Sequence, residues 1–258
     1  RSPRLSIPGR EHDRGGLDLV VEPGRRTVLL GRSGAGKSLL ARLALGRLPG
    51  PPVRSSGRVE IRTDSGTESV DLADWPAGAQ IPRLQALRGH TLSFVPQGGR
   101  ENLVPGWTVR DHLRHLLPDL ERQLADVVEG MEALGVDGGE ANLSAVATEL
   151  SEGMIRRILV ALAMARGAEI LVIDEPTTGL DPHSREAFSE LLHERILASG
   201  AGVLLVTHDL ELCARLGGEA LLVDDGAIVA QTDDISTASG AFQPFLDAVA
   251  DGPSVGEA

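Results

Sequence analysis

The stretch GRSGAGKS, residues 31–38, decides the fold of this chain. It follows the apolar run RTVLL (26–30), which predicts a short buried strand, and it precedes LLARLALGRL (39–48), whose apolar residues recur at helical spacing. A glycine-rich turn that joins a strand to a helix and ends in Gly-Lys-Ser is the pattern of a phosphate-binding loop. Its glycines let successive backbone N–H groups wrap a phosphate chain, and the helix N-terminus adds a favourable dipole.

The loop also supplies side chains for nucleotide chemistry. Lys37 can reach the β- and γ-phosphates, and the hydroxyl of Ser38 can ligate Mg²⁺. The alternative is a glycine-rich turn that only caps a core helix, but the strand and helix around the motif favour phosphate binding. The residues expected to bind ATP are Gly31, Arg32, Ser33, Gly34, Ala35, Gly36, Lys37, Ser38 and Leu39.

A pair of adjacent acids ends a second apolar strand, ILVIDEP (170–176). This strand is apolar on both faces, which is typical of a buried parallel sheet. At its carboxyl end Asp174 is expected to face the Mg²⁺ shell and Glu175 the attacking water. The alternative for the pair alone is a solvated turn. Gln97 and His208, at the ends of two further strands, carry no signal by themselves.

Composition limits the possible partners. The chain has 258 residues, 41% of them hydrophobic, and a formal charge of -12. Its acidity gives no general attraction to a phosphate backbone, so we expect no nucleic-acid partner. The single cysteine excludes an internal disulfide or a cysteine metal cluster. No apolar run reaches the roughly 18 residues that a membrane helix needs, and the first residues lack the apolar core of a secretory signal, so any membrane role is expected to come through a partner.

The remaining pattern predicts an α/β core with additions. Residues 57–72 alternate around a glycine turn and predict antiparallel strands, and residues 220–230 predict a hairpin. Residues 90–97 and 202–209 predict further strands, residues 108–165 and 184–198 helices, and the tail after Gln231 is small and polar. We expect residues 1–97 to form the first part of a nucleotide-binding core with an antiparallel β subdomain, 98–165 a helical subdomain, and 166–258 the second part of the core with the tail.

The order of short motifs along the chain resembles one family. GRSGAGKS is followed by VPQ (95–97), LSEGM (150–154), ILVIDEP, TTGLD (177–181) and VTHD (206–209), as in the ATP-binding cassette (ABC) ATPases. The resemblance runs from about Leu17 to Gln231 and is far more specific than the phosphate loop alone. It implies a P-loop NTPase core of RecA type with a mainly parallel sheet, a small antiparallel β subdomain and an inserted α-helical subdomain.

The resemblance also implies a role for residues outside the phosphate loop. Gln97 would link the nucleotide site to a transport subunit, His208 would hold the γ-phosphate and the water, and Asp181 would lie at a dimer contact. Ser151 and Gly153 belong to the family signature, usually LSGGQ, which covers the ATP held by a second subunit. The implied catalytic residues are Glu175, His208 and Gln97, and the implied metal ligands are Ser38, Gln97 and Asp174.

A finer resemblance is to the nickel and oligopeptide importer branch. It rests on GKSLLARLALGRLPG (36–50), the Gly-Met of the signature, DEPTTGLD and LLVTHDLELCARL (204–216). It implies an ATP-hydrolysing subunit at the cytoplasmic face of the cell membrane, with permease subunits, a second ATPase and an external binding protein as partners. The tail, SGAFQPFLDAV (239–249), departs from the His-Pro-Tyr-Thr segment often seen there. A soluble ABC ATPase of DNA repair or translation and an exporter ATPase are the alternatives.

Two departures from the family pattern concern mechanism. RLSIPGREHDRGG (4–16) lacks the aromatic residue that usually stacks on adenine, so either Pro8, His12 or an arginine packs there, or the base is poorly discriminated. We expect a weak preference for ATP over GTP. Glu152 replaces a signature glycine, and a carboxylate about 4 Å from a phosphate costs on the order of 1–4 kcal/mol. Either Glu152 points away from the ligand, or it weakens the site it covers, which implies a heterodimer of unlike ATPases.

Overall fold

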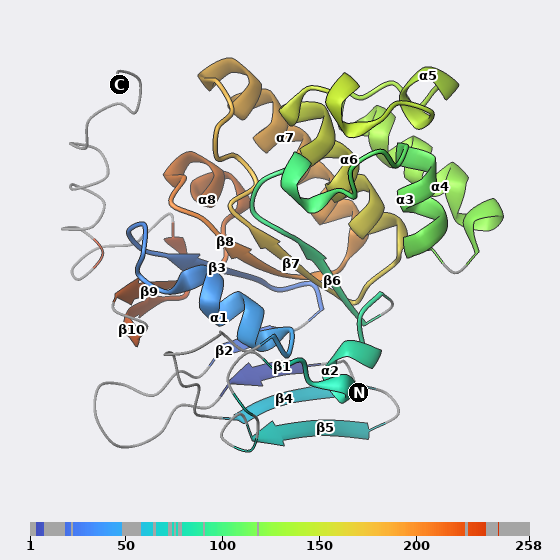
Figure 1. Cartoon of the computed structure of the whole chain (residues 1–258). Helices are drawn as coiled ribbons and strands as arrows, with labels where there is room; N and C mark the ends of the chain where they lie inside the picture. Colours follow the sequence, from blue (N-terminus) through green and yellow to red (C-terminus); the bar gives the residue numbers. More distant parts are fainter. Residues whose placement is uncertain are drawn as a thin grey trace.

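The computed structural model describes two β-sheets with helices packed around the larger one (Figure 1). The larger sheet has six strands in the order β10-β9-β3-β8-β7-β6, and the smaller has four in the order β2-β1-β4-β5. The described residues are 4–7, 19–21, 23–47, 58–63, 66–71, 74, 76, 79–89, 91–117, 119–224, 227–235 and 242.

The larger sheet is parallel except at one edge. Neighbouring strands pair in parallel from β9 to β6, and β10 pairs antiparallel with β9. The strands predicted around the phosphate loop, the acidic pair and the final hairpin are confirmed. Their bounds are Arg26–Leu30 (β3), Leu92–Val95 (β6), Ile170–Asp174 (β7), Gly202–Val206 (β8), Glu219–Asp224 (β9) and Ala227–Thr232 (β10).

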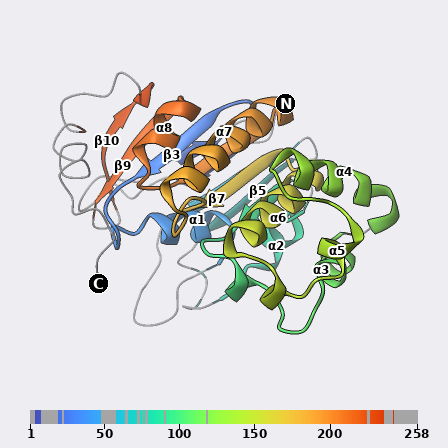
Figure 2. The same ribbon diagram turned by 90° about the horizontal axis from the view of Figure 1, so that it is seen from above.

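Both faces of this sheet are buried, because successive side chains of a strand point to opposite sides. In β3, Leu29 packs in the core on one side, while Val28 and Leu30 pack in the core on the other. The first core lies against α1 (Lys37–Ala44) and α2 (Pro82–Ala86), and the second lies against α6 (Glu152–Ala165), α7 (Pro182–Ser199) and α8 (Leu210–Leu216). Seen from above, α7 lies across the strands of the larger sheet (Figure 2). The predicted doubly covered parallel sheet is therefore present.

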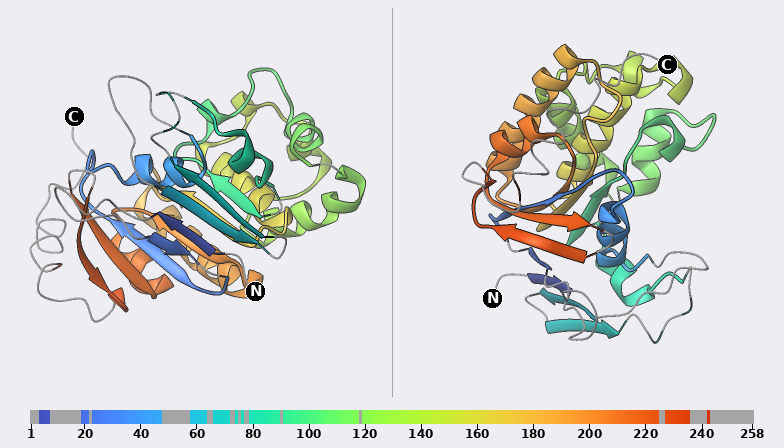
Figure 3. Two further views of the ribbon diagram at one scale, coloured as in Figure 1. Left: turned by 90° about the horizontal axis from the view of Figure 1, so that it is seen from below. Right: turned by 90° about the vertical axis from the view of Figure 1, so that its left-hand side faces the viewer.

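The smaller sheet lies on the side of α1, apart from α6–α8 (Figure 3). Its predicted antiparallel pair is β4 (Arg58–Thr63) and β5 (Gly66–Asp71). Two short strands, β1 (Arg4–Ile7) and β2 (Leu19–Val21), complete it, and the sequence pattern did not predict them. Strand β2 has three residues, too few to show an alternating pattern, and the four residues of β1, Arg-Leu-Ser-Ile, alternate only over the minimum length for that pattern.

A group of helices is inserted between β6 and β7, as predicted. It contains α3 (Val109–Leu116), α4 (Leu120–Ala133), α5 (Glu140–Leu143) and α6, with 3₁₀ turns at Arg100–Asn102 and Ala147–Glu149. Helices α4 and α6 pack closely, since a Cβ added at Gly130 would lie 3.2 Å from the Cβ of Ala161. The domain boundaries at residues 97 and 165 stay a prediction. Most of the tail after Gln231 lies outside the described residues. In the described part of the chain, no helix combines the length and apolarity needed to cross a bilayer.

Candidate functional site

Several of the predicted site residues directly follow parallel strands of the larger sheet, at the edge formed by the carboxyl ends of these strands. Val206 of β8 lies opposite both Leu29 of β3 and Asp174 of β7, and Val95 of β6 lies opposite Ile173. In a parallel sheet the segments beyond these positions leave the same edge side by side. These segments contain Gly31, Glu175, His208 and Gln97.

The phosphate loop has the backbone that its glycines predict. Gly34 and Gly36 have φ angles of 82° and 97°, which L side chains rarely adopt, and Gly36 caps the N-terminus of α1. A Cβ added at Gly31 would lie 2.3 Å from the carbonyl oxygen of Val223 in β9. A glycine is thus required at position 31 because two backbones approach closely there. Gly34 and Gly36 are required because of their positive φ angles.

Lys37 places a buried cation in the loop. Its Nζ donates to the carbonyl oxygens of Gly31 at 2.8 Å and Arg32 at 3.1 Å, and it lies 3.6 Å from Oε1 of Glu175. The Lys37 side chain is 5% exposed. The ammonium is therefore held within the loop itself, where its charge can act on a phosphate chain bound by the loop.

Ser38 and Asp174 are joined across the site. The hydroxyl of Ser38 donates to Oδ1 of Asp174 at 2.8 Å. Asp174 is fully buried, and its Oδ2 has no hydrogen-bond partner among the described residues. Burial raises the pKa of Asp174, and the charge of Glu175 raises it further, while the bond from Ser38 lowers it.

These two side chains fit a hard divalent cation. They supply a carboxylate and a hydroxyl, which are oxygen ligands of the type that Mg²⁺ prefers, and the unsatisfied Oδ2 is available to a ligand. Within the described ranges, no cluster of three or more His, Cys, Asp or Glu side chains could hold a metal. The fit is therefore to an ion that completes its shell with water and substrate phosphates.

Glu175 is held in an unusual backbone conformation. Its φ of 48° makes it the one non-glycine residue with positive φ in the described part of the chain, a conformation that costs roughly 1–2 kcal/mol. Its N–H donates to Val206 at 2.8 Å, and its Oε2 accepts hydroxyl bonds from Thr178 at 3.3 Å and Thr207 at 3.5 Å. These contacts fix the carboxylate at the sheet edge, so its conformation is maintained by the surrounding structure.

His208 completes an acid–base pair with Glu175. Its Nδ1 lies 2.8 Å from Oε2 of Glu175. This hydrogen bond raises the pKa of His208 above its ordinary value, against burial, which lowers it. The His208 side chain is 55% exposed, so the ring can be reached by a bound substrate while one nitrogen stays on the carboxylate.

Gln97 lies at the same end of the parallel strands, but its side chain forms no hydrogen bond with Lys37, Glu175 or His208. It is exposed, its carbonyl oxygen accepts from Nδ2 of Asn102 at 3.0 Å, and its side chain has no hydrogen bond with any residue the structure describes. The predicted roles of Gln97 as metal ligand and catalytic residue stay proposals.

The signature residues lie at the N-terminus of α6. Ser151 caps the helix, since its Oγ accepts from the N–H of Met154 at 3.2 Å. Ser151 is exposed, and Gly153 follows in the first helical turn. The exposed helix N-terminus can bind an anion, because its first N–H groups have no partner within the helix. The carboxylate of Glu152 turns to the backbone N–H of Arg100, which its Oε1 accepts at 3.4 Å.

Asp181 has a defined local role. It caps the N-terminus of α7, where its side chain accepts from the N–H of Ser184 at 3.1 Å. The bond from Ser184 lowers the pKa of Asp181. Its exposure leaves it available to a partner, and the dimer contact stays a prediction.

Some predictions concern parts outside the described residues, and some contacts were not predicted. Pro8 and His12, considered for the adenine, are outside the described residues. Sequence reasoning missed Thr178 and Thr207, which hold Glu175. Their hydroxyls within the TTGLD and VTHD motifs were the available signal.

Comparisons with known proteins agree with the geometry. The family described as ABC transporter matches residues 15–178. The nickel import ATP-binding protein NikD of Brucella abortus biovar 1 (strain 9-941) is 35% identical over 219 residues, which cover 83% of this chain and 78% of NikD. The oligopeptide transport ATP-binding protein OppD of Mycobacterium tuberculosis (strain ATCC 25618 / H37Rv) is 32% identical over 221 residues, which cover 83% of this chain and 34% of OppD.

Solved structures show the same fold. A bacterial ABC transporter cassette solved as a dimer aligns with a TM-score of 0.66 at 21% identity, covering 90% of this chain and 98% of that one. An ATP-binding subunit of an ABC transporter aligns with a TM-score of 0.65 at 22% identity, covering 90% of each chain. With the phosphate loop and acidic pair in place at the sheet edge, the fold is that of a P-loop NTPase. The chain belongs to the ABC transporter family and is an ABC-type ATPase.

Proposed function

We propose that this chain is the peripheral ATPase subunit of an ABC importer that takes up nickel or other metal complexes, or peptides. The observation that carries the proposal is the fixed carboxylate of Glu175, with His208 on one oxygen and Lys37 near the other. The sequence identity to NikD, a nickel import protein by name, and to OppD, an oligopeptide transport protein by name, supports this importer branch.

In the proposed mechanism, each side chain has one task. The loop amides and Lys37 bind the phosphates of ATP, and Ser38 and Asp174 would hold Mg²⁺. Bound there, the ion would supply positive charge beside the phosphate oxygens. Glu175 accepts the proton of the attacking water, and His208 orients that water and the γ-phosphate. Gln97 is the remaining proposed ligand of the metal and water.

The site needs a second subunit in this proposal. Ser151 and the N–H of Gly153 bind the γ-phosphate of ATP held by a partner ATPase, and the partner's signature covers the ATP of this chain. Asp181 lies at the contact. In this proposal the second ATPase is unlike this chain, so the pair is a heterodimer. Hydrolysis separates the pair, and that motion drives transport.

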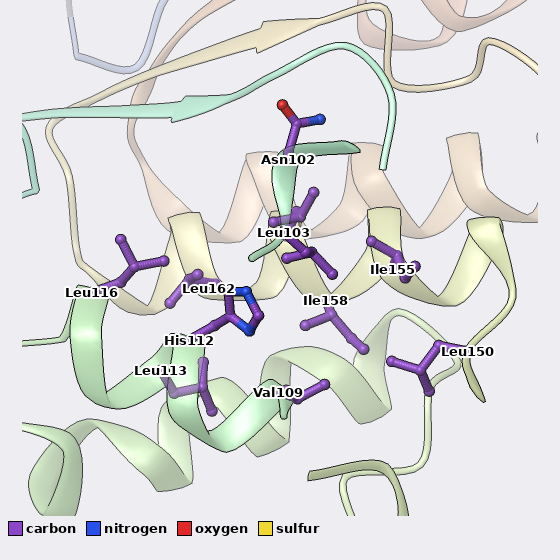
Figure 4. Close-up of a pocket in the computed structure, with 11 residues that line it drawn as sticks. Asn102, Leu103, Val109, His112, Leu113, Leu116, Leu150, Ile155, Ile158 and Leu162 are labelled. Atoms are coloured by element: carbon purple, nitrogen blue, oxygen red, sulfur yellow. The ribbon is translucent and has the colours of Figure 1, made fainter. Parts of the chain in front are cut away.

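The proposed permease contact is the segment after Gln97 together with residues 107–113. These segments border an apolar pocket in the helical group, with Leu103, Val109 and His112 among its lining residues (Figure 4). Val104, beside it, is 44% exposed. The permease places the chain at the cytoplasmic face of the membrane, where an external binding protein delivers cargo from the other side. No nucleic acid takes part.

The test is to isolate the tagged chain from membranes in mild detergent and identify every protein that copurifies. Two permeases and a second, different ATPase are the expected result, followed by ATP hydrolysis that nickel or peptide and the binding protein stimulate in proteoliposomes. A chain that copurifies with DNA, with ribosomes or with no membrane protein would overturn the importer proposal and leave the ATPase assignment intact.

A further inference from the structure

The carboxylate of Glu152 contacts residues 98–103, the Gln97 segment. Its Oε1 accepts from the N–H of Arg100 at 3.4 Å, although the two residues are 52 positions apart. Its side chain is 39% exposed. The signature residue that departs from the family glycine is therefore bonded inside its own subunit.

Packing at Gly99 shows how close this contact is. A Cβ added at Gly99 would lie 2.3 Å from Oε1 of Glu152 and 3.3 Å from Cγ2 of Ile155. Gly99 is buried, and a Cβ there would force the Glu152 carboxylate to shift from its present place. Gly99 therefore leaves the space that the carboxylate of Glu152 occupies.

A second contact joins the same segments in the reverse direction. The guanidinium of Arg100 donates from Nε to the carbonyl oxygen of Ala147 at 3.1 Å and from Nη2 to that of Leu150 at 2.9 Å. Leu150 directly precedes Ser151. Each segment thus binds the backbone of the other through a charged side chain, and such charge-assisted bonds are stronger than neutral ones. Figure 4 shows Asn102 and Leu103 of the Gln97 segment beside Ile155 and Ile158 of α6.

Arg156 extends the link to the segment after Glu175. Its Nε lies 3.9 Å from Oε1 of Glu152, and its Nη1 donates to the carbonyl oxygen of Pro176 at 3.5 Å. Arg156 is buried, so removing the carboxylate would leave its charge less well compensated. Glu152 thus stands between the Gln97 segment and the residue that follows Glu175.

We propose that Glu152 is a positioning residue: it fixes the signature, Ser151 and Gly153, relative to the Gln97 segment. This rests on the proposed function, in which the signature covers the partner's ATP. In this arrangement the carboxylate does not weaken the covered site. It holds the helix N-terminus in the orientation in which the Ser151 hydroxyl and the Gly153 N–H meet a phosphate.

This proposal and the weakened-site hypothesis predict opposite signs. If Glu152 repels the partner's γ-phosphate, its removal raises turnover. If Glu152 positions the signature, its removal lowers turnover at little cost to ATP affinity, because the phosphate loop of the partner still binds ATP. Glutamine keeps an oxygen acceptor for the N–H of Arg100, so Glu152→Gln should largely retain the wild-type rate.

The experiment compares Glu152→Ala and Glu152→Gln in the assembled complex, with ATP hydrolysis measured over a range of ATP concentrations. The matched control is Glu149→Gln, since Glu149 is a nearby exposed carboxylate that accepts from the N–H of Val146 in its own turn. Thermal unfolding of each chain confirms that the variants fold. Hydrogen exchange of residues 98–103 is followed in the full chain alone, without partner or ATP.

We expect Glu152→Ala to lower kcat about three- to tenfold, as for one lost hydrogen bond, with KM within about twofold. Amide exchange in residues 98–103 should become faster. Glu152→Gln and Glu149→Gln should stay near wild type. An unchanged or higher kcat in Glu152→Ala, an equal loss in Glu152→Gln, or unchanged exchange would overturn the proposal. A wild-type complex without ATP hydrolysis would refute the proposed function instead, and the exchange comparison would still decide whether Glu152 holds the Gln97 segment.

Discussion

Nδ1 of His208 lies 2.8 Å from Oε2 of Glu175, although 33 positions separate the two residues in the chain. They meet because β7 and β8 are neighbouring parallel strands in which Asp174 lies opposite Val206, so the residues after each strand leave the same edge. The pair brings a fixed carboxylate and a reachable imidazole together beside the phosphate loop.

The Glu175–His208 pair should make stability depend on pH. The hydrogen bond raises the folded-state pKa of His208 above the value of about 6.5 expected in the unfolded chain. Its contribution is therefore fully present below pH about 6.5 and is lost as pH rises through the higher folded-state pKa. The measurement is the free energy of unfolding of wild type and His208→Gln at about pH 5.5 and pH 8.5.

The difference between the two proteins should be larger at the lower pH. Comparing this difference removes the effect of the other titrating groups, which both proteins share. An equal difference at both values, or a larger one at about pH 8.5, would mean that the histidine gains nothing from the carboxylate when it is protonated.

Gly31→Ala should disrupt the phosphate loop by a steric clash. The new Cβ would lie 2.3 Å from the carbonyl oxygen of Val223, so strand β9 or the loop must move. We expect a loss of about 1–3 kcal/mol or more in stability and a large fall in ATP affinity. Gly24→Ala is the control. Gly24 also has positive φ, but no described residue lies within 4 Å of an added Cβ, so we expect only backbone strain of about 1 kcal/mol there. Similar stability losses and unchanged nucleotide binding in both would contradict the steric account.

Gly153→Ala should separate stability from activity. A Cβ at this position meets only Cδ2 of Leu180, at 3.5 Å, which is ordinary contact, and Ala favours a helix over Gly by up to about 1 kcal/mol. The chain should be as stable as wild type or more so. The assembled complex should lose about tenfold or more in turnover, because the methyl group would stand where the proposed function places the partner's phosphate. Unchanged turnover would remove Gly153 from the proposed phosphate contact.

Asp174→Asn should also separate stability from activity. Since burial raises the pKa of Asp174, ionisation opposes folding near neutral pH, and a neutral amide removes that cost. We expect equal or greater stability, a weaker dependence on Mg²⁺ and a loss of Mg²⁺-dependent hydrolysis on the order of a hundredfold or more. Ser38→Ala, which removes the hydroxyl on the same carboxylate, should shift the Mg²⁺ dependence in the same direction. Wild-type hydrolysis at low Mg²⁺ in Asp174→Asn would refute the proposed metal site.

The sequence predicts well those features that depend on local pattern and motif order. The strands β3, β7 and β8 are continuous apolar runs, and the parallel register alone brings Glu175 and His208 to one edge. The positive φ of Glu175 could not be predicted from the sequence, because glutamate normally avoids that conformation.

Long-range side-chain contacts could not be predicted. The sequence allowed Glu152 either to face a ligand or to turn away, and the answer depends on how α6 packs against the segment around Arg100. The close approach of Glu152 to Gly99 depends on the same packing. Strands β1 and β2 are too short for their pattern to be read without their partners.

The most direct test of the central claim, that this chain hydrolyses ATP at its own site through Glu175, is the variant Glu175→Gln in the assembled complex. The amide keeps the size of the side chain but cannot accept a proton from water. Hydrolysis and retention of labelled ATP are measured beside the control Glu190→Gln, an exposed acid on α7. We predict that Glu175→Gln binds and retains ATP while turnover at this site falls about a hundredfold or more, and that the control matches wild type. Turnover within about tenfold of wild type, with ATP released at the wild-type rate, would contradict the account.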